Sequence, residues 1–154
     1  MGRYSRDKGN AFERRIAKMI REALNISERE CHRTPRSGGH YVKGDLVLDP
    51  SQRERFPFIV ECKHSKRWTL SHILPVSGLM QQWLRQTYAQ AAEMEGRPLL
   101  IIMGDRTPIY AIVERAPDTL DSGHVSFAWL GRRLYLVRWE EWLQWVAMHE
   151  ADLA

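Results

Sequence analysis

Near the middle of the chain, two acidic residues and one lysine have the types and the spacing that metal-assisted chemistry needs. An apolar run, residues 58–60, leads directly into Glu61, Cys62 and Lys63. Alternate side chains of a β-strand point to opposite faces, so Glu61 and Lys63 share one face while Cys62 points to the other. Asp45 follows a glycine and precedes a second apolar run, which places its carboxylate at the start of a neighbouring strand near Glu61.

Two carboxylates beside an ammonium group suit a hard divalent cation such as Mg²⁺, which prefers oxygen ligands. Such a cation can activate water, so the pattern indicates hydrolysis of a phosphodiester bond. The alternative is that Glu61 and Lys63 form only a solvated ion pair, which would contribute at most about 1 kcal/mol. The surrounding sequence decides between these two interpretations.

The elements that must position these residues follow from hydrophobic periodicity and turn residues. An amphipathic helix is predicted from Lys8 to Leu24, a second from Leu79 to Met94, ended by Gly96, and a third from Trp139 to His149. Short apolar segments between turn residues predict strands over 30–34, 46–49, 58–63, 99–103, 109–113, 125–130 and 134–137. The order predicts an α/β (α+β) fold with a mixed central sheet flanked by helices, in a single domain over residues 1–154.

Composition and charge exclude several other classes of protein. No apolar run approaches the roughly 18 residues of a membrane span, and no apolar segment follows the charged N-terminus, so we expect a cytoplasmic protein without a secretory signal. Cys31 and Cys62 are the two cysteines, which argues against a disulfide framework. The net charge is +4, and basic residues crowd the first half of the chain around the acids. A basic rim around an acidic centre suits a polyanionic substrate.

Four short motifs occur in an order that is typical of one nuclease superfamily. They are Lys8-Gly9-Asn10-x-x-Glu13-Arg14 at the start of a helix, Arg33-Thr34-Pro35-Arg36-Ser37-Gly38, Gly44-Asp45 and Glu61-Cys62-Lys63. Together they resemble the PD-(D/E)XK nucleases, and within them most of all the archaeal-type Holliday junction resolvases and related phage endonucleases. The resemblance covers residues 8–103 and implies a restriction-endonuclease-like core.

The resemblance implies a role for each matching residue. Asp45 and Glu61 would bind Mg²⁺, or Mn²⁺ as a substitute, together with the main-chain carbonyl of Cys62. Lys63 would orient or deprotonate the attacking water and offset charge in the transition state. Glu13 would complete the site through a metal or its waters. Its alternative is an ordinary solvent-facing position on the helix.

The resemblance also suggests residues that hold the DNA. Ser37 could contact the scissile phosphate, although serine is equally common in turns. Arg14, Arg33 and Arg36 could bind phosphates, or they could be ordinary surface charges.

Two further positions bear on the comparison with the family. Gly44 stands where the family has a proline before the first acid. Gln86, with Gln82 as second choice, would point toward the site from the helix that resembles one placed beside the site in many of these nucleases. Helical glutamine is otherwise an ordinary surface residue.

Two competing interpretations concern soft ligands and aromatic residues. A structural zinc site could draw on five side chains, but their spacing contains no paired ligand unit; they are Cys31, His32, His40, Cys62 and His64. Trp139 and Trp142 share a helix face with Val146, so core packing or a subunit contact is expected there rather than stacking on bases.

The sequence therefore predicts a Mg²⁺-dependent DNA endonuclease, most specifically a resolvase of branched, four-way DNA that serves DNA recombination and repair. Such a junction needs two nicks related by its own two-fold axis, so a homodimer is expected. We expect no membrane partner, and a location in the host cytoplasm if a phage encodes the protein. The alternatives are a sequence-tolerant nicking or restriction-type endonuclease, and a catalytically inactive nucleic-acid-binding module with the same fold.

Overall fold

The computed structural model describes residues 2–35 and 44–150, which form three α-helices, two short 3-10 helices and seven strands. Their order along the chain is α1 (Arg3–Leu24), β1 (Cys31–Arg33), β2 (Leu46–Leu48), η1 (Pro50–Gln52), β3 (Phe58–His64), η2 (Leu70–His72), α2 (Gly78–Glu93), β4 (Arg97–Met103), β5 (Ile109–Val113), β6 (His124–Trp129), β7 (Arg132–Arg138) and α3 (Trp139–Met148).

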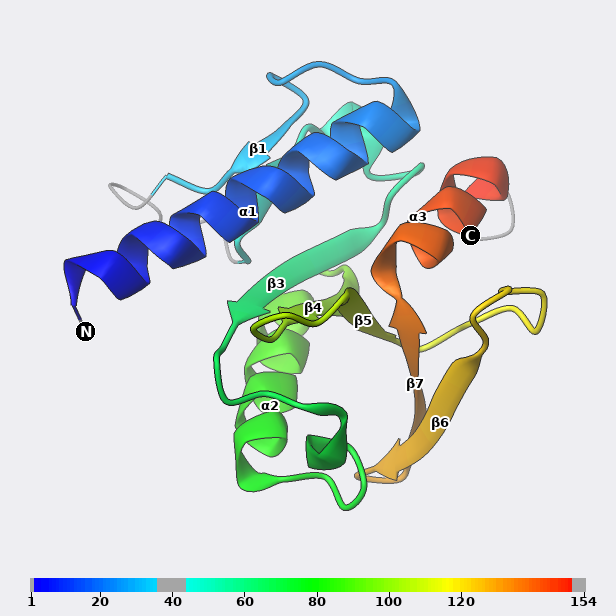
Figure 1. The fold of residues 1–154 in the computed structure, drawn as a ribbon. Coiled ribbons are helices and arrows are strands. Elements are labelled where there is room, and N and C mark those ends of the chain that lie inside the picture. Colours follow the sequence, from blue (N-terminus) through cyan, green and yellow to red (C-terminus); the bar gives the residue numbers. More distant parts are fainter. Residues whose placement is uncertain (1, 36–43, 151–154) are drawn as a thin grey trace.

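The strands form two sheets. The larger one has the order β3-β4-β5-β7-β6, in which β3 and β4 run parallel and the other neighbours run antiparallel. The smaller one is the antiparallel pair β1-β2. In Figure 1, α1 lies on one side of β3 and α2 lies on the other. The expected α+β fold with a mixed sheet and a restriction-endonuclease-like core is confirmed.

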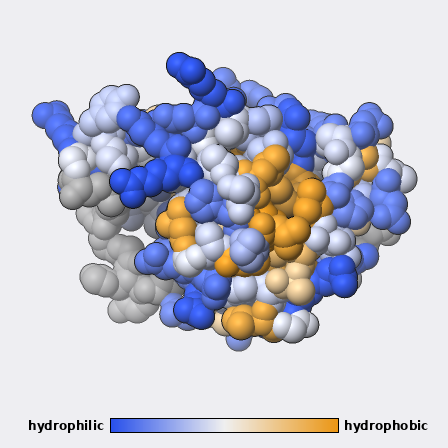
Figure 2. Space-filling view, turned by 60° about the horizontal axis from the view of Figure 1, so that its bottom comes forward, coloured by the Kyte–Doolittle hydropathy of each residue, from blue (hydrophilic) through white to orange (hydrophobic). Residues whose placement is uncertain are grey.

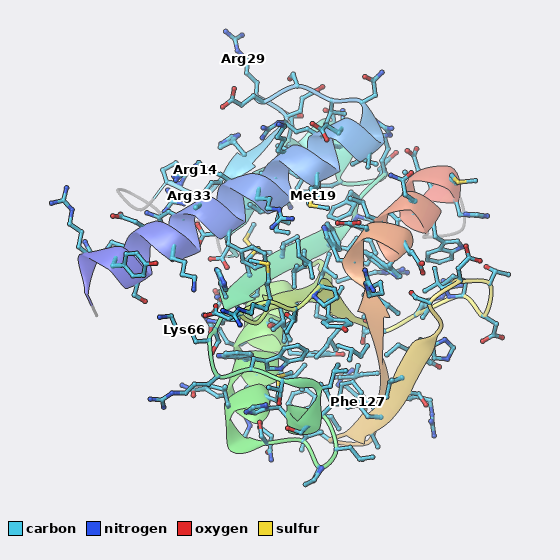
Figure 3. All side chains as sticks on the ribbon, in the orientation of Figure 1. Arg14, Met19, Arg29, Arg33, Lys66 and Phe127 are labelled. Atoms are coloured by element: carbon cyan, nitrogen blue, oxygen red, sulfur yellow. The ribbon has the colours of Figure 1, made fainter. Side chains whose placement is uncertain are left out.

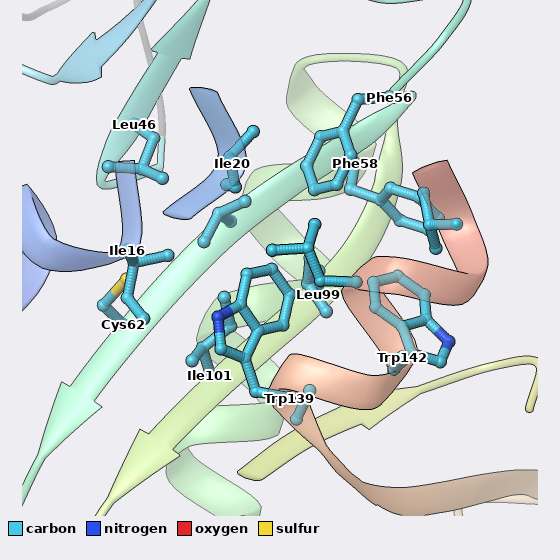
Figure 4. Packing of buried hydrophobic residues seen from close by; sticks show 14 of the residues in the cluster. Ile16, Ile20, Leu46, Phe56, Phe58, Cys62, Leu99, Ile101, Trp139 and Trp142 are labelled. Carbon is cyan, nitrogen blue, oxygen red and sulfur yellow. The ribbon is translucent and has the colours of Figure 1, made fainter. Parts of the chain in front are cut away.

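Each face of the large sheet carries its own hydrophobic core. On one face, α1 and α3 cover a cluster that includes Ile16, Val60, Cys62 and Leu99, several of which are visible in Figure 4. On the other face, α2 and the segment around Trp68 cover a second cluster. Phe58, Val60 and Cys62 all face the first cluster, so the alternation predicted for β3 is confirmed.

The helix ends differ from the expected ones for local reasons. Helix α1 begins at Arg3 rather than Lys8, and its first turns are exposed, so no buried apolar residue marks them in the sequence. Gly96 does not cap α2, because the C-cap is Met94. A Cβ at Gly96 would come within 2.5 Å of the Ile59 side chain, so glycine is needed there for close packing against β3.

The C-terminal helix contributes its tryptophan-bearing face to the core. Trp139 and Trp142 are 0% and 1% exposed, and Val146 is also fully buried. Core packing is therefore the confirmed alternative for this face, and these tryptophans are not available for stacking on bases.

Exposed apolar residues occur on a different part of the molecule. Figure 2 shows apolar side chains gathered on the face that lies at the bottom of Figure 1, where η2 and the turn between β6 and β7 lie. Leu70 in η2, Leu74 two residues after η2 and Leu130 in the turn are exposed, and Leu74 is the most exposed of the three at 80%. Among the described residues, no helix has the length and apolar character needed to cross a membrane.

Candidate active site

Strand β3 forms the edge of the large sheet, and its last residues carry the predicted acid and lysine. Glu61 is 3% exposed, and its Oε1 forms an ion pair with Lys63 Nζ at a distance of 3.0 Å. The two side chains lie on the α2 face of the strand, as their spacing predicts. A buried carboxylate and an ammonium group are thus fixed side by side at the sheet edge.

Asp45 is the residue that precedes β2, and it lies at the same edge of the large sheet. Its backbone N–H donates to Val60 O at 2.8 Å, and one carboxylate oxygen accepts the Cys62 N–H at 2.7 Å. Thr34 on the other side also holds this backbone, because its N–H donates to Asp45 O at 2.9 Å. The carboxylates of Asp45 and Glu61 are therefore positioned by adjoining backbone segments.

The surroundings of Asp45 and Glu61 disfavour the charged form of both carboxylates and raise their pKa values. Burial raises the pKa of Asp45 from 3.8 to about 7, with a further rise from the Glu61 charge and a partial reduction from the Cys62 N–H bond. Burial also raises the pKa of Glu61, and the Lys63 ammonium opposes that rise. The charge of Glu13 raises both pKa values. A nearby cation would stabilise the charged carboxylates and lower both pKa values.

The side chains present fit a hard divalent cation. Glu61 Oε2 is buried and has no hydrogen-bond partner among the described residues, which leaves a carboxylate oxygen free to coordinate. Asp45 adds a second carboxylate. Within residues 2–35 and 44–150, no three His, Cys, Asp or Glu side chains are close enough together to hold a metal by themselves. A cation here would need main-chain, water or phosphate oxygens as well, which is how Mg²⁺ is usually bound.

Glu13 approaches from α1 but is engaged with another residue. Its Oε2 accepts a 2.5 Å bond from Arg33 Nε, and both side chains are largely buried. Arg33 also donates from Nη2 to Asn10 Oδ1 at 2.8 Å. The predicted roles of Glu13 at a metal and of Arg33 on DNA phosphates remain predictions, and the two residues are in direct contact.

Helix α2 contributes two glutamines to the site, of which the sequence pointed to one. Lys63 Nζ donates to Gln86 Oε1 at 2.9 Å, so Gln86, the first choice, contacts Lys63. Both Gln86 and Gln82 are exposed, so this hydrogen bond rather than burial distinguishes Gln86. Gln90 lies one turn later, and its amide lowers the pKa of Glu61. The spacing of four residues between Gln86 and Gln90 is the signal that could have indicated both, since such residues share a helix face.

The remaining predicted positions lie around the site or outside the described residues. Ser37 and Arg36 fall in 36–43, outside the part of the chain that the structure describes. Arg14 is exposed on α1, one residue after Glu13, which contacts Arg33; Figure 3 labels Arg14 and Arg33.

Among the described residues, the candidate zinc ligands do not form a group that could hold a metal. The Cys31 thiol is buried and directed to Ala17 O, and Cys62 is buried in the core. His64 lies near Asp105 and packs against the Phe12 ring. His40 is outside the described residues.

With this geometry established, comparison with known proteins identifies the family. Residues 4–134 match the family described as "Phage putative PDDEXK endonuclease". The chain belongs to this PD-(D/E)XK phage endonuclease family. The expected superfamily is thereby confirmed, and with it a nuclease of a class that typically uses divalent metals.

One curated relative adds to the comparison. This PD-(D/E)XK protein is 30% identical to Protein D14 of Escherichia phage T5 over 108 residues, which cover 66% of this chain and 66% of that relative. The chain thus matches somewhat less than two thirds of the length of that protein. No solved structure matches the present chain.

Proposed function

We propose that this protein is a Mg²⁺-dependent DNA endonuclease, with Mn²⁺ as a working substitute, and that its site is built from Asp45, Glu61 and Lys63. The observation that carries the proposal is the buried Glu61 Oε2, which has no partner among the described residues and lies in a site that already contains a second strained carboxylate. Hydrophobic packing alone gives no reason to bury such an oxygen.

The site residues divide the work of hydrolysis. Asp45 and Glu61, with the Cys62 carbonyl, would hold the cation, and the bound cation supplies activation of water and neutralisation of phosphate charge. Lys63 is held between Glu61 and Gln86 at 3.0 and 2.9 Å, so its ammonium can donate toward a phosphoryl oxygen without first being ordered. Glu13 adds negative charge from α1 at the edge of the site.

For the substrate, we propose branched DNA, in particular a four-way junction, cut by a homodimer in the host cytoplasm. The motif order that resembles the resolvases supports the substrate, and two-fold symmetry of the junction supports the dimer. The exposed leucines at 70, 74 and 130 offer apolar surface for self-association. The presence of Asp45, Glu61 and Lys63 together argues against a catalytically inactive binding module.

Parallel cleavage assays on a four-way junction, a flap and a linear duplex of the same sequence test this substrate. In Mg²⁺, we expect the junction to be cut at least about tenfold faster than the duplex, by paired symmetric nicks. Equal rates on all three substrates would reject the resolvase proposal and leave a general endonuclease. Absence of cleavage on all of them would reject the enzymatic proposal itself.

A further inference from the structure

Arg33 is bound to two residues of α1 at once. Its Nε donates to Glu13 Oε2 at 2.5 Å, and its Nη2 donates to Asn10 Oδ1 at 2.8 Å. Residues three apart on a helix lie on the same face, so the fork of one guanidinium can reach both. The Arg33 and Glu13 side chains are 20% and 14% exposed. The guanidinium is therefore held on α1 rather than extended into solvent.

The backbone of Arg33 is tied to the other half of the site. Arg33 pairs with Leu46 in the β1-β2 sheet, one residue after Asp45. The next residue, Thr34, donates its N–H to Asp45 O and its hydroxyl to Gly44 O, at 2.9 and 3.0 Å. Arg33 thus connects the two separate elements that supply Glu13 and Asp45.

The contact between Arg33 and Glu13 also balances charge at the site. Three carboxylates lie at this edge of the sheet, and each has a different source of compensation. Glu61 has Lys63 at 3.0 Å, Asp45 has the Cys62 N–H at 2.7 Å, and Glu13 has Arg33. Without a cationic partner, the Glu13 carboxylate would be repelled from the other two and could turn toward solvent.

We propose that Arg33 is a positioning residue rather than a phosphate-binding residue: it fixes the Glu13 carboxylate at the edge of the metal site and balances its charge. This inference refines the site of the proposed nuclease and rests on that function for its activity measurement. Two other measurements, DNA affinity and thermal unfolding, do not require turnover.

The test compares Arg33→Gln and Arg33→Lys with the matched control Arg29→Gln. Arg29 is an exposed arginine, and Figure 3 shows it well separated from Arg14 and Arg33. DNA affinity is measured in Ca²⁺ over a range of salt concentrations. We expect Arg33→Gln to change affinity less than twofold and to leave the salt slope unchanged, while kcat falls about 10- to 100-fold because Glu13 is misplaced.

The lysine variant separates geometry from charge. A lysine is a single ammonium group and cannot make the forked contact with both Glu13 and Asn10. Arg33→Lys should therefore remain slow in cleavage. A loss of DNA affinity of tenfold or more in Arg33→Gln, with the salt slope lowered by about 1 and restored in Arg33→Lys, would overturn the proposal in favour of phosphate binding.

Thermal unfolding of the free protein keeps the proposal testable if no DNA is bound or cut. Glu13→Gln and Arg33→Gln should each lower Tm, and the double variant should lower it no more than the more damaging single change, because both remove one interaction. Additive Tm shifts would show that the two side chains act independently and would overturn the proposal. If wild type binds and cuts DNA in that case, the proposed function still stands.

Discussion

The charge of Asp45 should lower the free energy of unfolding of the metal-free protein, and Asp45→Asn should therefore raise it. The variant removes the charge while the amide oxygen can still accept the Cys62 N–H. Each unit of pKa shift corresponds to about 1.4 kcal/mol, so the rise from 3.8 to about 7 sets an upper limit of about 4 kcal/mol. Relaxation around the carboxylate lowers this limit, and we expect a gain of about 1 to 3 kcal/mol at pH 8.

The pH dependence of this gain follows from the direction of the shift. An acid with a higher pKa in the folded chain binds more protons when folded, so stability falls as pH rises from about 4 to about 7 and then levels off. The advantage of Asp45→Asn should therefore be largest at pH 8 and less than half as large at pH 5.

Urea unfolding in EDTA at both pH values measures this difference. The exposed acid Asp121 provides the control, and Asp121→Asn should change stability by less than about 0.5 kcal/mol. Mg²⁺ should stabilise wild type and leave Asp45→Asn nearly unchanged, because the cation binds the folded wild-type site. If Asp45→Asn is no more stable than wild type at pH 8, the description of Asp45 as a strained metal ligand is wrong.

Two further predictions concern catalysis and assembly. Lys63→Ala should lower kcat by about 10² to 10⁴-fold with less than a tenfold loss of DNA affinity, because its ammonium is ordered for the transition state; single-turnover kinetics would contradict this if the rate stayed near wild type. Light scattering at micromolar concentration should give twice the chain mass of 18.1 kDa, and Leu74→Lys should give monomers, because Leu74 is a large apolar side chain that is 80% exposed. A monomeric wild type would reject the proposed dimer.

The parts of the site that lie on one strand could be predicted from the sequence. The period of two along residues 58–63 places Glu61 beside Lys63 and buries Cys62, and the structure has this arrangement. Strand β5 has the predicted bounds, since an apolar run between turn residues defines it at both ends. Local pattern is sufficient wherever one element determines the geometry.

Contacts between distant elements could not be predicted in the same way. The pairing of Arg33 with Glu13 depends on how α1 packs against β1, and a helix pattern carries no information about that packing. The role of Gln90 depends on which face of α2 covers β3. The helical start at Arg3 was missed because exposed polar residues give no hydrophobic period.

Cleavage of labelled DNA by wild type and Glu61→Gln, each in Mg²⁺ and in excess EDTA, tests the central claim most directly. Glu61→Gln removes the charge of the buried carboxylate whose Oε2 has no partner among the described residues. We predict that wild type cuts in Mg²⁺ and not in EDTA, and that Glu61→Gln binds DNA at least as tightly but cuts at least about 10³-fold more slowly. Undiminished cutting in EDTA, or near wild-type cutting by Glu61→Gln in Mg²⁺, would contradict the assignment of this site.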